Sequence, residues 1–72
     1  MQARQTITRH EQFRRQAGYT VTGLARRIDF SHTYVSRIEG QDVPASARYR
    51  KAVARVFGVR QALLFDKDGR AS

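Results

Sequence analysis

Four hydrogen-bonding side chains near the middle of the chain share one face of an expected helix. They are His32, Thr33, Ser36 and Arg37. Their spacing of i, i+1, i+4 and i+5 places them opposite the apolar Val35 and Ile38. An Arg guanidinium can bind O6 and N7 of a guanine, a Thr methyl can touch a thymine methyl, and a His can donate to a guanine or a phosphate. This face therefore suits contacts with the edges of nucleic-acid bases.

The net charge points to a polyanionic partner. The chain has 14 Lys plus Arg against six Asp plus Glu, which gives +8, and all of these cations except Lys51 and Lys67 are Arg. Arg makes forked contacts with phosphates and guanine edges. The charge favours nucleic acid, although a solubilising basic surface, a ribosomal role or a membrane-surface role would also produce it.

Residue types that catalysis or metal binding would need are sparse. Cysteine is absent, and His10 and His32 are too few for a structural zinc site. Ser36 has no base at a triad-like spacing, the carboxylates are scattered, and no phosphate-binding Gly-rich loop exists. We therefore expect that the protein is not an enzyme and that it binds no metal, cofactor or small-molecule substrate. No segment resembles a signal peptide or a membrane span, so the expected location is the cytoplasm.

Helical periodicity and capping residues predict five short helices in an all-α domain. The expected ranges are from Thr6 or Thr8 to about Ala17, Val21 to Ile28, Ser31 to Glu39, Pro44 or Ser46 to about Phe57, and Arg60 to Phe65. We expect Phe13 and Ala17 to face inward from the first helix. The compact domain then spans residues 7–65, between a polar N-terminal arm (1–6) and a polar C-terminal tail (66–72).

The joint between the second and third expected helices is very short. Only Asp29 and Phe30 separate the two helices, and so short a joint makes them cross steeply, as in a helix-turn-helix. Ala25 supplies a small residue near the crossing, and Val35 and Ile38 supply the inner face of the third helix. Asp29 has to tolerate left-handed backbone, which Gly adopts more easily.

The stretch TVTGLARRIDFSHTYVSRIEG resembles the helix-turn-helix of the Cro and lambda-repressor type, the XRE family. The resemblance covers about residues 7 to 65 and implies a lambda-repressor-like DNA-binding fold. Two positions depart from the family. Val21 stands where a phosphate-binding Gln is common, and Asp29 stands where Gly is usual. The further matching segments are Phe13-Arg14, Gly18-Tyr19-Thr20, Val53-Ala54, Phe57-Gly58-Val59 and Leu64-Phe65.

The resemblance implies that the third helix, residues 31–39, enters the major groove of double-stranded DNA. Base contacts fall on His32, Thr33 and Arg37, with Ser36 alongside. His32 and Thr33 could instead contact only phosphate or cap the helix, and Arg37 could be a solvated charge. The expected phosphate contacts are Thr20, Thr22, Ser31, Tyr34, Arg48 and the backbone N–H groups of Ala45, Ser46 and Ala47.

Several other side chains receive weaker expectations. We expect Ser31 to cap the third helix in preference to contacting a phosphate. We expect the Tyr34 hydroxyl to reach a backbone group or a phosphate. Arg4, Arg9, Arg48 and Arg50 are close enough to the expected interface to assist, whereas Arg26, Arg27, Arg55 and Arg60 receive no role.

The resemblance also implies two structural contacts. Arg14 and Glu39 are expected to pair and so tie the third helix to the first, with two unrelated surface charges as the alternative. An apolar cluster near the C-terminus exceeds what a tail needs, and some of it is expected to form a homodimer interface. Its members are Val59, Leu63, Leu64 and Phe65.

These features together indicate a small sequence-specific transcriptional regulator, like a phage Cro protein or short repressor. It would bind a double-stranded DNA operator as a homodimer, in a prokaryotic cell or a phage-infected host. A DNA-binding antitoxin or a restriction-system controller would use the same mechanism. From a different class, a protein-interaction module could keep the fold without reading DNA, and Val21 is the one feature that favours it.

Overall fold

The computed structural model describes residues 7–72, so the expected arm, with Arg4 and Thr6, lies outside the described residues. Four α-helices follow one another, α1 (Arg9–Gln16), α2 (Val21–Ile28), α3 (His32–Glu39) and α4 (Ala47–Phe57), and then a single 3₁₀ turn, η1 (Gln61–Leu63). Within residues 7–72 the only strand-like pairing is an isolated bridge between Phe65 and Ala71. The described part of the chain is therefore all-α, as predicted.

The short fifth helix expected over Arg60–Phe65 is reduced to the single 3₁₀ turn of η1. Arg60 provides no side-chain cap for η1, and the Leu63 and Leu64 N–H groups make only short-range bonds to the carbonyls of Arg60 and Gln61. Helix nucleation is costly, and this segment is too short to repay that cost. The chain instead turns Leu64 and Phe65 into the core.

Each α-helix begins at a hydroxyl side chain that accepts a hydrogen bond from the backbone N–H three residues later. These caps are Thr8, Thr20, Ser31 and Ser46. Each such cap stabilises a short helix by about 1 kcal/mol. Local sequence signals therefore fix where all four helices start.

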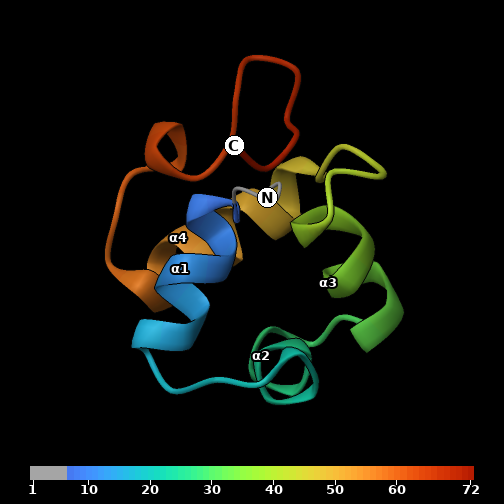
Figure 1. The fold of residues 1–72 in the computed structure, drawn as a ribbon, viewed down its shortest axis with the longest axis vertical. Helices are drawn as coiled ribbons and strands as arrows, with labels where there is room; N and C mark the ends of the chain where they lie inside the picture. Colours follow the sequence, from blue (N-terminus) through green and yellow to red (C-terminus); the bar gives the residue numbers. More distant parts are fainter. Residues whose placement is uncertain (1–6) are drawn as a thin grey trace, which may run out of the picture.

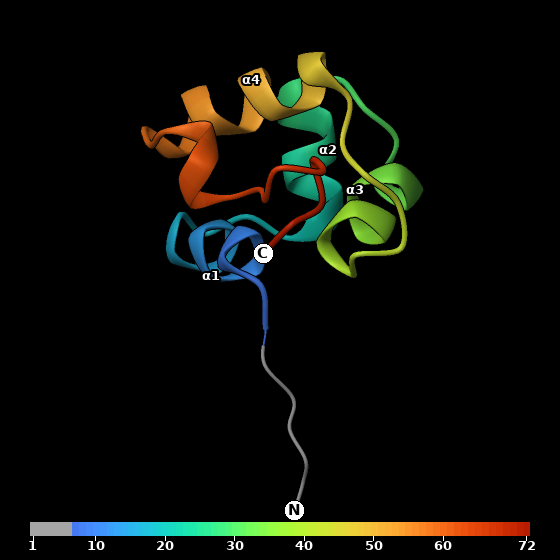
Figure 2. The same ribbon diagram turned by 90° about the horizontal axis from the view of Figure 1, so that it is seen from above.

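The hydrophobic core lies where α2, α3 and α4 meet the segment after η1. Leu24, Val35, Tyr49, Val53 and Leu64 are fully buried there. Figure 1 shows α3 on one side of the domain, with the C-terminal half of α4 and η1 on the other side, and Figure 2 shows the same separation after a 90° turn.

α1 faces the core in part as expected. Phe13 is half-buried and packs against the core, as predicted, but Ala17 is exposed, so the expectation for Ala17 is wrong. His10 and Arg14 are buried instead. Polar side chains occupy this interface because α3 and α4 present polar partners to them, as described below.

Residues 66–72 fold back onto the domain instead of extending from it. Ala71 is fully buried. The Ser72 carbonyl accepts from the Arg9 N–H at 2.7 Å, and the Gly69 carbonyl accepts from the Ala45 N–H at 2.8 Å. The Gln41 side chain also donates to the Ala71 carbonyl at 2.7 Å. The C-terminal segment thus fastens α1 to the loop between α3 and α4.

Candidate nucleic-acid interface

The joint between α2 and α3 is a left-handed turn at Asp29, with φ 64° and ψ 50°. The Phe30 N–H donates to the Ala25 carbonyl at 2.9 Å, and Ala25 is almost fully buried at the crossing of the helices. Among L-residues, Asp and Asn tolerate this conformation best after Gly. The short joint, the small residue and the left-handed turn that the sequence predicted are all present.

α3 divides cleanly into a buried and an exposed side. Val35 and Ile38 are fully buried, and Ser31 Oγ accepts from the Tyr34 N–H at 3.1 Å to cap the helix. The four expected base contacts all lie on the exposed side: His32, Thr33, Ser36 and Arg37. The structure thus brings these four side chains together on one free face.

The start of α2 presents two exposed hydroxyls. Thr20 Oγ1 accepts from the Gly23 N–H at 2.9 Å, so its own O–H remains free to donate, and Thr22 is also exposed. A Cβ at Gly23 would lie 3.1 Å from Thr20 Oγ1, which explains a glycine within this helix. Val21 is half-buried and packs against the core. Any phosphate contact here therefore falls to the threonines.

The expected backbone donors before α4 need correction at two positions. The Ala45 N–H already donates to Gly69, and the Ser46 N–H donates to the Tyr34 hydroxyl at 3.1 Å. Neither group is free for a phosphate. Ala47 and Arg48 occupy the first positions of α4, where N–H groups have no intrahelical acceptor, so these two remain suitable donors.

Aromatic packing holds Arg48 beside the helix-turn-helix joint. Its guanidinium carbon lies 4.5 Å from the centre of the Phe30 ring, and that ring stacks on Tyr34 at 5.6 Å. Stacking uses the face of the guanidinium and leaves its N–H edges available for an anion.

Arg9 and Arg50 are held differently. Arg50 donates to the Ala45 carbonyl and Arg9 donates to the Leu63 carbonyl, so both side chains are engaged by backbone carbonyls of other residues in the domain. This leaves Arg48 as the better placed of the arginines around α4.

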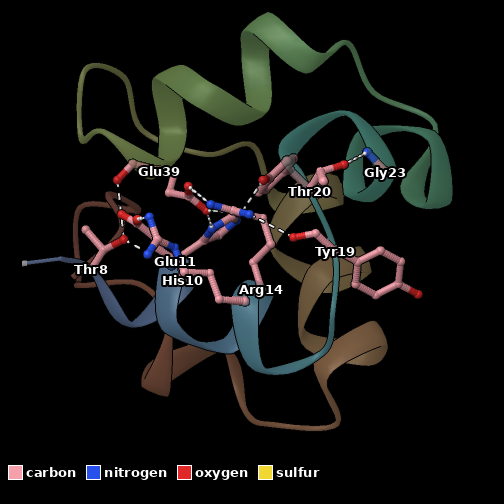
Figure 3. A network of polar contacts seen from close by, with 10 residues as sticks. Thr8, His10, Glu11, Arg14, Tyr19, Thr20, Gly23 and Glu39 are labelled. Atoms are coloured by element: carbon pink, nitrogen blue, oxygen red, sulfur yellow. Dashed lines mark hydrogen bonds and ion pairs between the residues drawn. The ribbon is translucent and has the colours of Figure 1, made fainter.

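A buried polar network attaches α3 to α1 (Figure 3). Arg14 approaches Glu39 with two parallel contacts, Nε to Oε2 at 2.8 Å and Nη2 to Oε1 at 2.9 Å. Arg14 Nη1 also donates to the Tyr19 carbonyl at 2.7 Å, just before α2. Arg14 and Glu39 thus lie as the family resemblance implied, and the pair fixes the base of α3 to the scaffold.

His10 extends this network to α4. Its Nδ1 lies 2.8 Å from Glu39 Oε2, and its Nε2 lies 2.8 Å from the Tyr49 hydroxyl. The carboxylate can only accept, so Nδ1 carries a proton. The side chain is fully buried. Our sequence reasoning considered His10 only as a metal ligand, although its i, i+4 spacing from Arg14 places both on the same face of α1.

These contacts shift three pKa values. Burial alone would raise the pKa of Glu39, but hydrogen bonds from His10 and Arg14 outweigh it and lower that pKa to about 2. The hydrogen bond to Glu39 raises the pKa of Arg14, and burial raises the pKa of Tyr49 well above its usual value. Glu39 is therefore an ion at neutral pH and holds both of its partners.

The expected dimer cluster also needs correction. Leu64 is fully buried and Phe65 is 5% exposed, so both are core residues of the monomer. Val59 is half-buried, and Leu63 is 38% exposed. Only the latter two can contribute to an external contact.

Two further findings concern residues 7–72. No three His, Asp or Glu side chains gather there as metal ligands would. None of the helices in this part of the chain has the length and apolarity needed to cross a bilayer.

The chain matches a known protein family. A family model described as a helix-turn-helix domain matches residues 11–64, which run from α1 to the end of η1 and include the whole α2–α3 unit. No curated protein and no solved structure matches the chain. The matched family indicates a DNA-binding regulator.

Proposed function

The chain belongs to the helix-turn-helix domain family, and from this premise we propose that it is a sequence-specific regulator that reads double-stranded DNA with α3 in the major groove. The observation that carries the proposal is the exposed polar face of α3, on a chain of net charge +8. An α-helix has a diameter of about 10–12 Å, which suits a major groove about 12 Å wide.

Base reading is assigned to the face of α3. Arg37 would contact a guanine through two hydrogen bonds, Thr33 a thymine methyl, and His32 and Ser36 further base edges. All four are exposed, while Val35 and Ile38 anchor the opposite side of the helix. An anchored helix loses little conformational freedom when it binds, which favours discrimination between sequences.

Phosphate contacts would flank α3 on both sides. Thr20 and Thr22 at the start of α2 would supply hydroxyl donors, with Ser31 at the start of α3. The N–H groups of Ala47 and Arg48 would add donors at the positive end of the α4 dipole. These contacts would set register and affinity, whereas the face of α3 would set sequence preference.

The finer assignment follows the resemblance to the Cro and lambda-repressor type. We propose a lambda-repressor-like fold and a role like that of a phage Cro protein or short repressor, in a prokaryotic cell or infected host. Two copies would occupy half-sites about one helical turn apart, because one domain contacts few base pairs. The core packing of Val21 accounts for that residue without a protein partner.

The salt dependence of binding to random duplex DNA tests this proposal. Phosphate contacts release counterions, so a plot of log K against log salt concentration should have a slope steeper than about −3. Arg48→Ala should make the slope shallower by about 1, and Lys67→Ala, on the C-terminal segment, should leave it unchanged. A flat slope for the unmodified chain would refute DNA binding as the function.

A further inference from the structure

Several cations that DNA recognition leaves without a role gather along α4. Lys51 and Arg55 lie on this helix, with Arg27 from α2 beside them and Arg60 after the helix. All four are exposed, and none belongs to an ion pair among residues 7–72. α4 itself contains no Asp or Glu. This surface therefore carries an uncompensated positive charge.

Apolar side chains form the floor between these cations. An open groove of about 770 Å³ runs between the C-terminal half of α4 and η1, with Ala54, Val59 and Leu63 among its lining residues. Lys51, Arg55 and Arg60 line the same groove, and no acidic side chain does. Leu63 is one of the few large apolar side chains that remain exposed in residues 7–72. We call this hollow the α4–η1 groove.

A second hollow continues the pattern on the other side of the same cations. It has a volume of about 260 Å³ and lies between the end of α2 and α4. Apolar Ile28, Ala52 and Val56 line it, with Arg27, Lys51, Arg55 and also Arg48, which is a proposed DNA contact. Lys51 and Arg55 border both hollows. The two cations thus form a ridge with apolar surface on each side.

The α4–η1 groove lies on the side of the domain opposite α3. Figures 1 and 2 both show η1 and the end of α4 far from α3. A ligand in this groove would leave the exposed face of α3 free, so both surfaces could be occupied at once.

Charge and apolarity together select the occupant. A second copy would bring like charges of both copies together, which is unfavourable at an interface. A nucleic acid would neutralise the cations but would leave the apolar floor unmatched. An amphipathic segment with acidic and apolar side chains satisfies both. We propose that the α4–η1 groove binds an acidic amphipathic segment of a partner protein, so that the chain connects that partner to DNA.

The test measures binding of a fluorescein-labelled 14-residue peptide in which Leu recurs every three to four residues and Glu fills the other positions. A peptide with Gln in place of Glu tests the charge, and one with Ser in place of Leu tests the apolar floor. Arg55→Glu and Leu63→Ser alter the groove at exposed positions, and Lys67→Glu is the control of equal charge change. Fluorescence anisotropy gives the affinities, with and without saturating duplex DNA.

We expect Arg55→Glu and Leu63→Ser each to weaken binding of the Leu/Glu peptide at least about fivefold, and Lys67→Glu less than about twofold. Both altered peptides should bind weakly, and DNA should not displace the Leu/Glu peptide.

Equal binding of the Ser-substituted peptide would overturn the proposal, because it would show only attraction between a polycation and a polyanion. Displacement by DNA would place the peptide on the α3 side and overturn it too. If the chain instead self-associates in sedimentation and Leu63→Ser abolishes this, the occupant is a second copy. DNA binding by the same variants, measured separately, shows whether the proposed function holds independently.

Discussion

Glu39→Gln is the substitution that most directly tests how α3 is held. The carboxylate accepts from Arg14 Nε at 2.8 Å, Arg14 Nη2 at 2.9 Å and His10 Nδ1 at 2.8 Å, and the residue is only 9% exposed. A Gln side chain has nearly the same shape, but it has no charge and one of its two polar groups donates. That donor would face another donor, and Arg14 would become an unpaired buried cation.

Two independent lines give the magnitude. Removing one partner of a buried ion pair costs about 3–5 kcal/mol. A pKa that falls from 4.5 to about 2 corresponds to roughly 3 kcal/mol of stabilisation by the ionised form. Because the pKa of Glu39 is lowered on folding, this contribution is complete above pH 4.5 and is lost as the pH falls towards 2. A domain of 72 residues has a total stability of about 4–11 kcal/mol, so the loss would be large.

Urea unfolding followed by circular dichroism measures this effect. At pH 7 we expect Glu39→Gln to lower the free energy of unfolding by about 3 kcal/mol, and at pH 2.5 we expect the difference from the unmodified chain to shrink substantially. Glu11→Gln is the matched control, since within residues 7–72 the only ion pair of Glu11 is with the exposed Arg15 on α1, which should contribute less than about 1 kcal/mol. If Glu39→Gln unfolds like Glu11→Gln at pH 7, or if its deficit is the same at both pH values, the network does not hold α3 as described.

Three further substitutions test the turn, the loop and the C-terminal segment, each by urea unfolding. Asp29→Gly should stabilise the domain by up to about 1 kcal/mol, because Gly adopts the left-handed backbone at φ 64° without strain. Asp29→Asn should change the stability little. Destabilisation by Gly would contradict the turn assignment. Tyr34→Phe removes the acceptor of the Ser46 N–H and should lower the free energy of unfolding by about 0.5–1.5 kcal/mol. An unchanged stability would show that water replaces the hydroxyl fully. Gly69→Ala should lower the free energy of unfolding by at least about 1 kcal/mol, because φ is 85° and the added Cβ would lie 3.0 Å from Arg50 Nη1. An unchanged stability would mean that the C-terminal segment does not pack as described.

Short-range signals predicted the helix starts and the helix-turn-helix joint well. The caps Thr20, Ser31 and Ser46 each act within three residues along the chain, so the sequence nearby contains all the information required. The left-handed turn at Asp29 is similarly local. The exposed face of α3 followed from helical spacing once Val35 was assigned to the core.

Long-range contacts set the features that the sequence did not reveal. The role of His10 depends on Glu39 and Tyr49, which lie 29 and 39 residues further along the chain. Burial of Ala71 depends on the loop between α3 and α4, which the polar composition of residues 66–72 did not suggest. The same folding back removed the Ala45 N–H from the expected phosphate donors. These three features each depend on which helices and segments contact one another in the folded domain, and local sequence patterns do not contain that information.

Selection of bound sites from random duplex DNA, with the unmodified chain and with Arg37→Ala, tests whether α3 reads base sequence. Arg60→Ala is the control, because Arg60 is exposed and immediately precedes η1, which lies on the side of the domain away from α3 (Figure 1). We expect the unmodified chain and Arg60→Ala to select the same motif. Arg37→Ala should lose its preference at one guanine and keep the other positions, at a cost of about 1–3 kcal/mol. An equal loss of affinity for all sequences, with no position relaxed, would contradict base reading by α3.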